Sequence, residues 1–196
     1  MKTIILTCKK TQSRISILIL SFFLLAISCH KKPVEDPLHP TNYPSPTFTG
    51  ADKLVCKIDG EFFEIINGSA LVGTNSKWVN YDGGKLVIKG YDNGMIKEGL
   101  SRTITINIGA LNKLGSYEII PKFNYYSTVF NSASISSSQS GFFETDSIYN
   151  GSVSITKIDT NIQKRIICGT FSFKALNKKT NQITVVSDGW FDLLYY

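Results

Sequence analysis

The residues of this sequence best suited to acid–base chemistry are two carboxylates, Glu144 and Asp146. Side chains two apart on a β-strand point the same way, with about 7 Å between their Cα atoms. A pair of carboxylates can hydrolyse a glycosidic bond, and their separation sets the stereochemistry. The same spacing is typical of a solvated strand face beside a loop, which is the interpretation we favour. A carboxylate-based hydrolase is therefore the third and weakest of our functional hypotheses.

Both histidines, His30 and His39, lie ahead of the segment that we expect to fold. Histidine supplies the general base of Ser-His-Asp and Cys-His sites and a common nitrogen ligand of metals. The sequence also lacks a glycine-rich loop ending in Gly-Lys-Ser/Thr and the Asp-x-Asp-x-Asp-Gly spacing of a calcium loop. We predict that the protein is not an enzyme and that it uses no metal and no cofactor.

Aromatic side chains suggest a second kind of site. Trp78, Tyr81 and Trp190 could provide flat platforms for sugar rings. Trp78 and Tyr81 lie three residues apart, so on one strand they face opposite ways and one of them belongs to the core. Aromatic residues also fill the cores of β-sheet proteins, which is the simpler explanation. Binding of a glycan or small ligand therefore stands as the second hypothesis.

Two cysteines lie in the segment expected to fold, Cys56 and Cys168. An oxidising compartment would permit a disulfide between them. The alternation of side chains argues against it, because Cys56 shares the apolar face of its strand with Ile58, whereas the face that carries Phe171 excludes Cys168. A bulge at Gly169 could reverse that register. We favour two buried free thiols and keep the disulfide as the alternative.

Residues 1–28 have the composition of an export signal. They hold four basic residues and no acidic one, and they include most of the apolar run that leads from Ile15 to Cys29. This is the build of a signal peptide, and the run is shorter than the ~20 residues that a membrane-spanning helix needs. Removing the leader lowers the formal net charge from +6 to +2. The domain then offers no basic surface for nucleic acid, which we exclude as a partner.

The end of this leader, Leu25-Ala26-Ile27-Ser28-Cys29, resembles the lipobox of bacterial lipoproteins, in which the cysteine becomes the acylated first residue. The likeness implies acyl chains such as palmitate on Cys29 and a firm anchor in an envelope membrane. An ordinary secretory signal, with Cys29 as a free thiol, is the alternative. Residues 29–50 would form a tether, because five of the six prolines lie there. At ~3.1 Å per residue the tether could reach about 60 Å.

Residues 51–196 consist of short runs with β-strand character, punctuated by six Asn-Gly or Asp-Gly pairs. Such pairs tolerate positive φ and close tight hairpins. The pattern predicts a single all-β domain over residues 51–196, either an antiparallel β-sandwich or a flattened barrel. We expect Asp188-Gly189 to be a turn between strands at 182–187 and 190–194. We expect Ser132–Ser140 to be a serine-rich loop.

Five segments carry a resemblance to known proteins: CKIDGEFF (56–63), GSYEI (115–119), GSVSIT (151–156), GTFSFKA (169–175) and DGWF (188–191). In this order they resemble a group of exported lipoproteins from Bacteroidota whose domain has no known function. The likeness covers about residues 51–196 and implies an all-β envelope domain, without bringing a catalytic residue. Some surface-displayed lipoproteins of that phylum have acidic residues after the anchor cysteine. Here Lys31 and Lys32 follow it, which favours the periplasmic side of an outer-membrane anchor.

One short motif fits the same phylum. Asp146-Ser147-Ile148 matches the Asp-Ser/Thr-aliphatic pattern of O-glycosylation in Bacteroidota, which makes Ser147 a candidate acceptor. Our first hypothesis is a lipid-anchored envelope lipoprotein whose all-β domain binds or scaffolds another envelope protein without catalysis.

Overall fold

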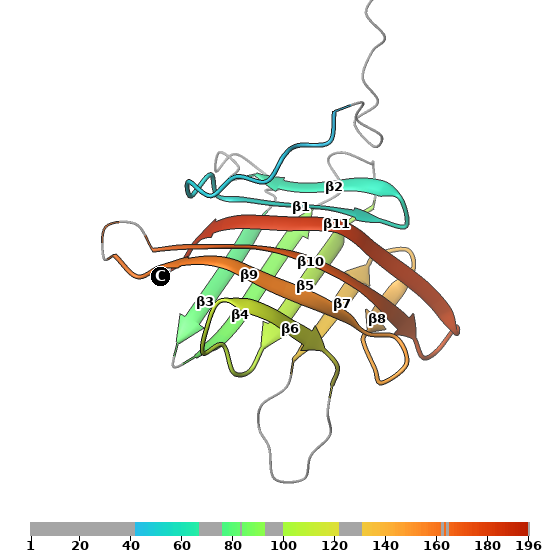
Figure 1. Cartoon of the computed structure of the whole chain (residues 1–196). Coiled ribbons are helices and arrows are strands. Elements are labelled where there is room, and N and C mark those ends of the chain that lie inside the picture. The colour runs from blue at the N-terminus through green and yellow to red at the C-terminus, as the bar shows by residue number, and fades with distance from the viewer. Residues whose placement is uncertain are drawn as a thin grey trace, which may run out of the picture. The chain divides into compact units, whose positions relative to one another are not determined.

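The computed structural model describes residues 42–66, 76–82, 84–92, 100–121, 131–161, 163 and 165–195, all within the compact unit Asp36–Tyr196. These residues form eleven β-strands and no helix (Figure 1). The strands are β1 Lys53–Ile58, β2 Glu61–Ile66, β3 Ser76–Asp82, β4 Lys85–Asp92, β5 Arg102–Ile108, β6 Gly115–Ile119, β7 Ser132–Ser137, β8 Gly141–Glu144, β9 Gly151–Asp159, β10 Ile166–Asn177 and β11 Gln182–Leu194. Within the described part of the chain, no helix is long and apolar enough to cross a membrane.

All eleven strands belong to one antiparallel sheet, with the order β2-β1-β11-β10-β8-β7-β5-β4-β3. One edge of β10 pairs with β11, and its other edge pairs with β9 along Ile166–Phe173 and then with β8 at Leu176. β6 extends the sheet beyond β9. The sheet curls until β2 lies beside β4 and β3, which makes a half-barrel around one core (Figure 1). The predicted all-β antiparallel class is confirmed.

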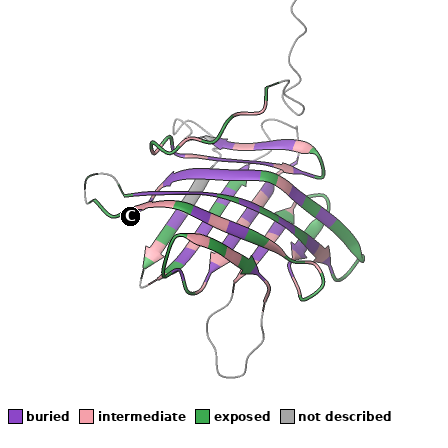
Figure 2. Cartoon of the chain, in the orientation of Figure 1, coloured by how far each residue is buried: buried purple, intermediate pink, exposed green. Residues whose placement is uncertain are grey.

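Side-chain alternation places one face of the curled sheet in this core. In β5, every second residue from Arg102 to Ile108 is buried, and β4 alternates in the same way (Figure 2). In β10, Phe171 and Phe173 face the core while Thr170 is exposed, as the sequence predicts. The core therefore forms inside the curl, where apolar side chains leave water.

The expected turn at Asp188-Gly189 is wrong. β11 runs through these residues without a break from Gln182 to Leu194. Asp188 does have the positive φ of 53° that such a pair tolerates. It lies in a β-bulge, because Phe171 pairs with Gly189 and Phe173 pairs with Val186. The Asp-Gly pair therefore bends a long strand instead of ending it.

The expected serine-rich loop at Ser132–Ser140 is also wrong over most of its length. Residues Ser132–Ser137 form β7, which pairs with β5. Ala133 and Ile135 are buried between the serines, so this segment has the two-residue period of a strand with one polar face. Serine is common in loops, but here it supplies the outward positions of a strand.

The two central strands meet through reciprocal glycine–phenylalanine pairs. Gly169 of β10 lies opposite Phe191 of β11, and Phe171 lies opposite Gly189. A Cβ on either glycine would come within 2.6 Å of the opposing ring, so each ring occupies the space that a side chain would take. The Phe171 and Phe191 rings stack with centroids 6.2 Å apart. Glycine in a strand commonly marks such a close approach or a bend.

A buried carboxylate ties the segment before β1 to the outer face of β11. Asp192 has no exposed surface. It accepts hydrogen bonds from the Thr47 hydroxyl (2.6 Å), from the backbone N–H groups of Thr49 (3.0 Å), Gly50 (2.8 Å) and Ala51 (3.0 Å), and from the Cys168 thiol (3.1 Å). Burial raises the pKa of Asp192, but the hydrogen bonds outweigh it and hold that pKa below its ordinary value.

Residues 42–50 lie against the sheet, although they belong to the predicted tether. The Trp190 indole N–H donates to the Pro44 carbonyl (3.0 Å), and the Tyr43 hydroxyl donates to the Asp188 carbonyl (2.5 Å). The Tyr43 ring also packs edge-on against Phe62, with centroids 5.9 Å apart. This end of the tether therefore covers apolar side chains on the outer face.

Replacing Gly169 by alanine should destabilise the domain by about 1–3 kcal/mol, because the new methyl group must displace the Phe191 ring or the Ser154 carbonyl. Thr170→Ala, on the exposed face of the same strand, should cost less than about 1 kcal/mol. Urea unfolding of both variants measures the difference. Equal losses would show that the glycine has no packing role.

Replacing Asp192 by asparagine should cost about 2–4 kcal/mol, because an amide cannot accept all the hydrogen bonds that a buried carboxylate accepts. The pKa of Asp192 is lowered in the folded state, so its contribution is present above the unfolded pKa of about 4. It is lost as the pH falls through the folded pKa. The wild type should therefore lose stability in acid more steeply than the variant.

Asp188→Asn is the matched control, since Asp188 is exposed and forms a surface ion pair with Lys57. It should change the free energy of unfolding by less than about 1 kcal/mol. Urea unfolding at neutral and acidic pH compares the variants. If Asp192→Asn keeps the full pH dependence of the wild type, the ionised Asp192 carboxylate does not stabilise the fold as proposed.

Candidate functional site

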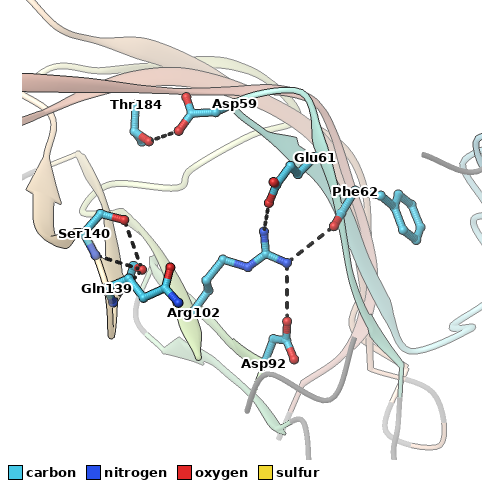
Figure 3. Close-up of polar contacts among 9 residues, drawn as sticks. Asp59, Glu61, Phe62, Asp92, Arg102, Gln139, Ser140 and Thr184 are labelled. Carbon is cyan, nitrogen blue, oxygen red and sulfur yellow. Dashed lines mark hydrogen bonds and ion pairs between the residues drawn. The ribbon is translucent and has the colours of Figure 1, made fainter. Parts of the chain in front are cut away.

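A cavity of about 230 Å³ opens at one end of the half-barrel, and we refer to it as the Arg102 cavity. Its walls come from the β1–β2 turn, the start of β5, the β7–β8 turn and β11 (Figure 3). The polar lining is Asp59, Glu61, Arg102, Ser137, Gln139, Ser140 and Thr184, and the apolar lining is Ile58, Leu100, Ile135 and Phe143. The cavity thus combines an apolar wall with charged and amide groups, and it is more polar than most small-molecule pockets.

Arg102 is the central side chain of this cavity. It begins β5 in the inward register, and its side chain is only 4% exposed. Nη1 lies 3.5 Å from Glu61, and Nη2 lies 3.5 Å from both Asp92 and the Phe62 carbonyl (Figure 3). The guanidinium carbon stands 5.2 Å from the centroid of the Phe63 ring. Nε has no hydrogen-bond partner among the described residues.

The electrostatics of the site are dominated by carboxylates. Glu61 and Asp92 both face the single guanidinium, so the trio carries a net negative charge. Asp92 is buried, whereas the Glu61 side chain is 31% exposed. Both ion pairs are longer than the 2.7–2.9 Å typical of a charge-assisted hydrogen bond. Arginine stays protonated in proteins, so Arg102 can donate hydrogen bonds and hold charge but cannot exchange protons.

The rim of the cavity is fixed by hydrogen bonds. The Asp59 carboxylate accepts from the Thr184 hydroxyl (2.5 Å) and from the Val185 N–H (2.7 Å). The Asp59-Gly60 pair closes the β1–β2 hairpin with positive φ angles of 53° and 84°, as predicted. On the opposite wall, Asn177 Nδ2 donates to the Ser140 carbonyl (2.9 Å). The Asp59 carboxylate and the Ser140 backbone are therefore held in place before any ligand arrives.

The predicted carboxylate pair does not lie on one strand. β8 ends at Glu144, so Asp146 lies in the following turn and not on the same strand. Glu144 pairs with Lys178. Asp146 Oδ1 accepts from the N–H groups of Ile148 (2.8 Å) and Tyr149 (2.6 Å), which stabilises the turn. Each carboxylate thus has a separate structural role, although both line a shallow groove on the outer surface.

The structure places the side chains of two of the three predicted aromatic platforms. Trp78 lies in β3, but its side chain is outside the described residues. Tyr81 is partly buried and packs edge-on against Tyr195, with centroids 5.4 Å apart. Trp190 is only 2% exposed and lies under Tyr43 on the outer face of the sheet, where both residues line a hollow. Tyr81 packs against the core and Trp190 lies on the outer face, so these two rings do not share one site.

The two cysteines are free and lie on opposite faces of the sheet. Cys56 packs in the core, whereas Cys168 donates to Asp192 on the outer face. Burial and the hydrogen bond to Asp192 raise the pKa of Cys168 to about 12. Both thiols are therefore held protonated, and this geometry forms no disulfide between them.

The remaining predicted sites can be placed only in part. Ser147 is exposed in the turn that Asp146 stabilises, next to the exposed Ile148. Cys29 lies outside the described residues. The described part of the chain holds no group of three His, Cys, Asp or Glu side chains that could bind a metal ion.

An exposed apolar patch lies near the β10–β11 turn, on the outer face of the sheet. We define it as Phe142, Leu176, Ile183 and Val185. Phe142 is 54% exposed, Ile183 46% and Val185 39%. Leu176 lies opposite Ile183 in the sheet and lines a shallow hollow together with Phe142. The four side chains are therefore neighbours on one surface.

Sequence reasoning missed both Arg102 and this patch. Arg102 had one detectable signal, since it occupies the same two-residue register as the inward Ile104, Ile106 and Ile108. A charged residue in a core register requires a partner. The patch had no such signal, because its residues come from three strands.

The comparisons with known proteins identify a family and no function. Residues 56–193 match the family model described as Domain of unknown function (DUF6252). No curated protein and no solved structure matches the chain. The match begins within β1 and ends within β11, so it includes the Gly–Phe pairs, Asp192 and the residues that line the Arg102 cavity. The chain belongs to this family of domains of unknown function, DUF6252.

Proposed function

We propose that the protein is a lipid-anchored component of a bacterial envelope whose domain binds another envelope protein without catalysing a reaction. The observation that carries this proposal is the apolar patch of Phe142, Leu176, Ile183 and Val185. Contiguous exposed apolar surface on a soluble domain is a mark of protein interaction sites. The outer face of strands β8, β10 and β11 would present this surface to a partner of matching shape.

The charges around the patch indicate what that partner carries. Lys174, Lys178 and Lys179 are exposed beside it, and Glu144 pairs with Lys178. The rim is therefore positive overall. A partner with an apolar centre and acidic residues at its rim would complement it, since complementary charge directs association and selects partners.

The docked segment 42–50 supports an arrangement close to the membrane. Because residues 42–50 are bound to the outer face, roughly 12 residues remain between them and Cys29. At ~3.1 Å per residue these could reach about 37 Å, instead of about 60 Å for a tether that is free as far as residue 50. Lys31 and Lys32 favour the periplasmic side. A membrane-bound partner near the same leaflet fits this reach.

Crosslinking in living cells tests the patch. A photo-crosslinking amino acid at Ile183 should give one discrete adduct with a second protein, whereas the same group at Thr156, exposed on β9, should not. Phe142→Glu should abolish the adduct, because a negative charge meets the acidic rim of the partner. Phe142→Leu should keep it.

The outcome is decided by the pair of Phe142 variants. Both should melt at the wild-type temperature, since Phe142 is mostly exposed. Adducts of equal yield at positions 183 and 156, or an adduct that survives Phe142→Glu, would contradict an interface at this patch.

The anchor is tested separately by cell fractionation. The wild-type chain should be found in the membrane fraction and should take up labelled palmitate, and Cys29→Ser should abolish both because the acyl chains supply the anchor. Protease added to intact cells should spare the domain and protease added to lysed cells should degrade it. Loss of the domain from intact cells would overturn the periplasmic placement. Uptake of palmitate by Cys29→Ser would refute Cys29 as the lipid site.

A further inference from the structure

We propose that the Arg102 cavity binds a small, hydroxyl-rich molecule without a negative charge, of the size of one sugar ring. This site is distinct from the apolar patch, which lies on the opposite face of the sheet. The cavity would bind a small molecule and not a protein, and its central residue, Arg102, is not among the candidates that the sequence suggests. It does not depend on the identity of a protein partner.

The size of the cavity limits the ligand. Its volume of about 230 Å³ lies below the roughly 300–1,000 Å³ of pockets that hold drug-sized molecules. One ring with its substituents fits this space, and a longer oligosaccharide could place only one unit inside. The apolar side chains of Leu100, Ile135 and Phe143 form part of the lining, where the C–H face of a ring can pack.

The polar groups of the cavity match hydroxyl groups. Asp59 and Glu61 can only accept hydrogen bonds, Arg102 can only donate, and the Gln139 amide can do both. A hydroxyl donates and accepts, so adjacent hydroxyls on a ring can pair with carboxylate and guanidinium at the same time. The fixed position of Asp59, held by Thr184 and Val185, reduces the entropy that binding would cost.

Arg102 itself is incompletely satisfied. Its side chain is 96% buried, and its Nε lacks a partner among the described residues. Its polar contacts with Glu61, Asp92 and the Phe62 carbonyl are all 3.5 Å long. A buried donor without an acceptor is costly, and such groups in native proteins call for an explanation. A ligand oxygen inside the cavity that Arg102 lines would supply the missing acceptor.

The charge of the described lining disfavours acids. Among the described residues of the cavity wall, Asp59 and Glu61 face one guanidinium, that of Arg102. An anionic ligand would be repelled by this net negative charge. The described lining therefore favours neutral and amino sugars over a sugar acid.

The test uses the full chain in a detergent without a sugar headgroup. Glucose, galactose, glucosamine and glucuronate are titrated separately while the melting temperature is measured, since a ligand that binds only the native state raises it. At least one neutral hexose should raise the melting temperature to a plateau, and glucuronate should not. Gln139→Ala should weaken that binding about 3- to 10-fold, the usual effect of one lost hydrogen bond.

Two further variants make the result specific to the cavity. Gln163→Ala removes an exposed glutamine that does not line the cavity and should leave binding unchanged. Glu61→Gln removes one negative charge and should increase the affinity for glucuronate relative to the neutral hexose. The proposal is overturned if no member of the panel binds, if Gln139→Ala and Gln163→Ala behave alike, or if glucuronate binds the wild type as tightly as a neutral hexose.

Discussion

The structure depends on the close approach of β10 and β11 at their reciprocal glycine–phenylalanine pairs. Gly169 and Gly189 leave room for the opposing rings, so the strands can bend while Phe191 and Phe171 cover the exposed backbone. That bend lets a single sheet enclose its own core. It also brings β2 beside β4 and β3, and Arg102, at the start of the neighbouring β5, reaches Glu61 of β2. The Arg102 cavity is thus a product of this curvature.

The same strand organises the outer surface. Trp190 and Asp192 flank Phe191 in β11 and point outward, because side chains alternate. Trp190 supplies an apolar surface for Tyr43, and Asp192 accepts hydrogen bonds from the backbone N–H groups of residues 49–51. A buried carboxylate that accepts five hydrogen bonds cannot be released without exposing unpaired donors and an unpaired charge. The tether is therefore bound by the strand that also holds the core together.

The sequence was informative where the evidence is local. Alternation within β10 predicted its inner phenylalanines, and the Asp59-Gly60 pair predicted the first hairpin turn. The reasoning failed where a local signal has two structural meanings, as at Asp188-Gly189, which forms a bulge, and at Ser132–Ser137, which forms a strand. It could not find the Arg102 site, because Arg102 and Glu61 lie 41 positions apart and meet only in the closed sheet. No local pattern contains that contact.

The alternation of side chains along β8 and β11 also places the two proposed binding sites on opposite faces of the sheet. In β8, Phe142 belongs to the outer patch and Phe143 lines the cavity; in β11, Ile183 belongs to the patch and Thr184 lines the cavity. The two sites therefore lie back to back on the same strands, one with a positive rim and the other with a negative lining. An acidic protein surface suits the first and is repelled by the second. A neutral ligand in the cavity leaves the outer face exposed, so both sites can be occupied at once.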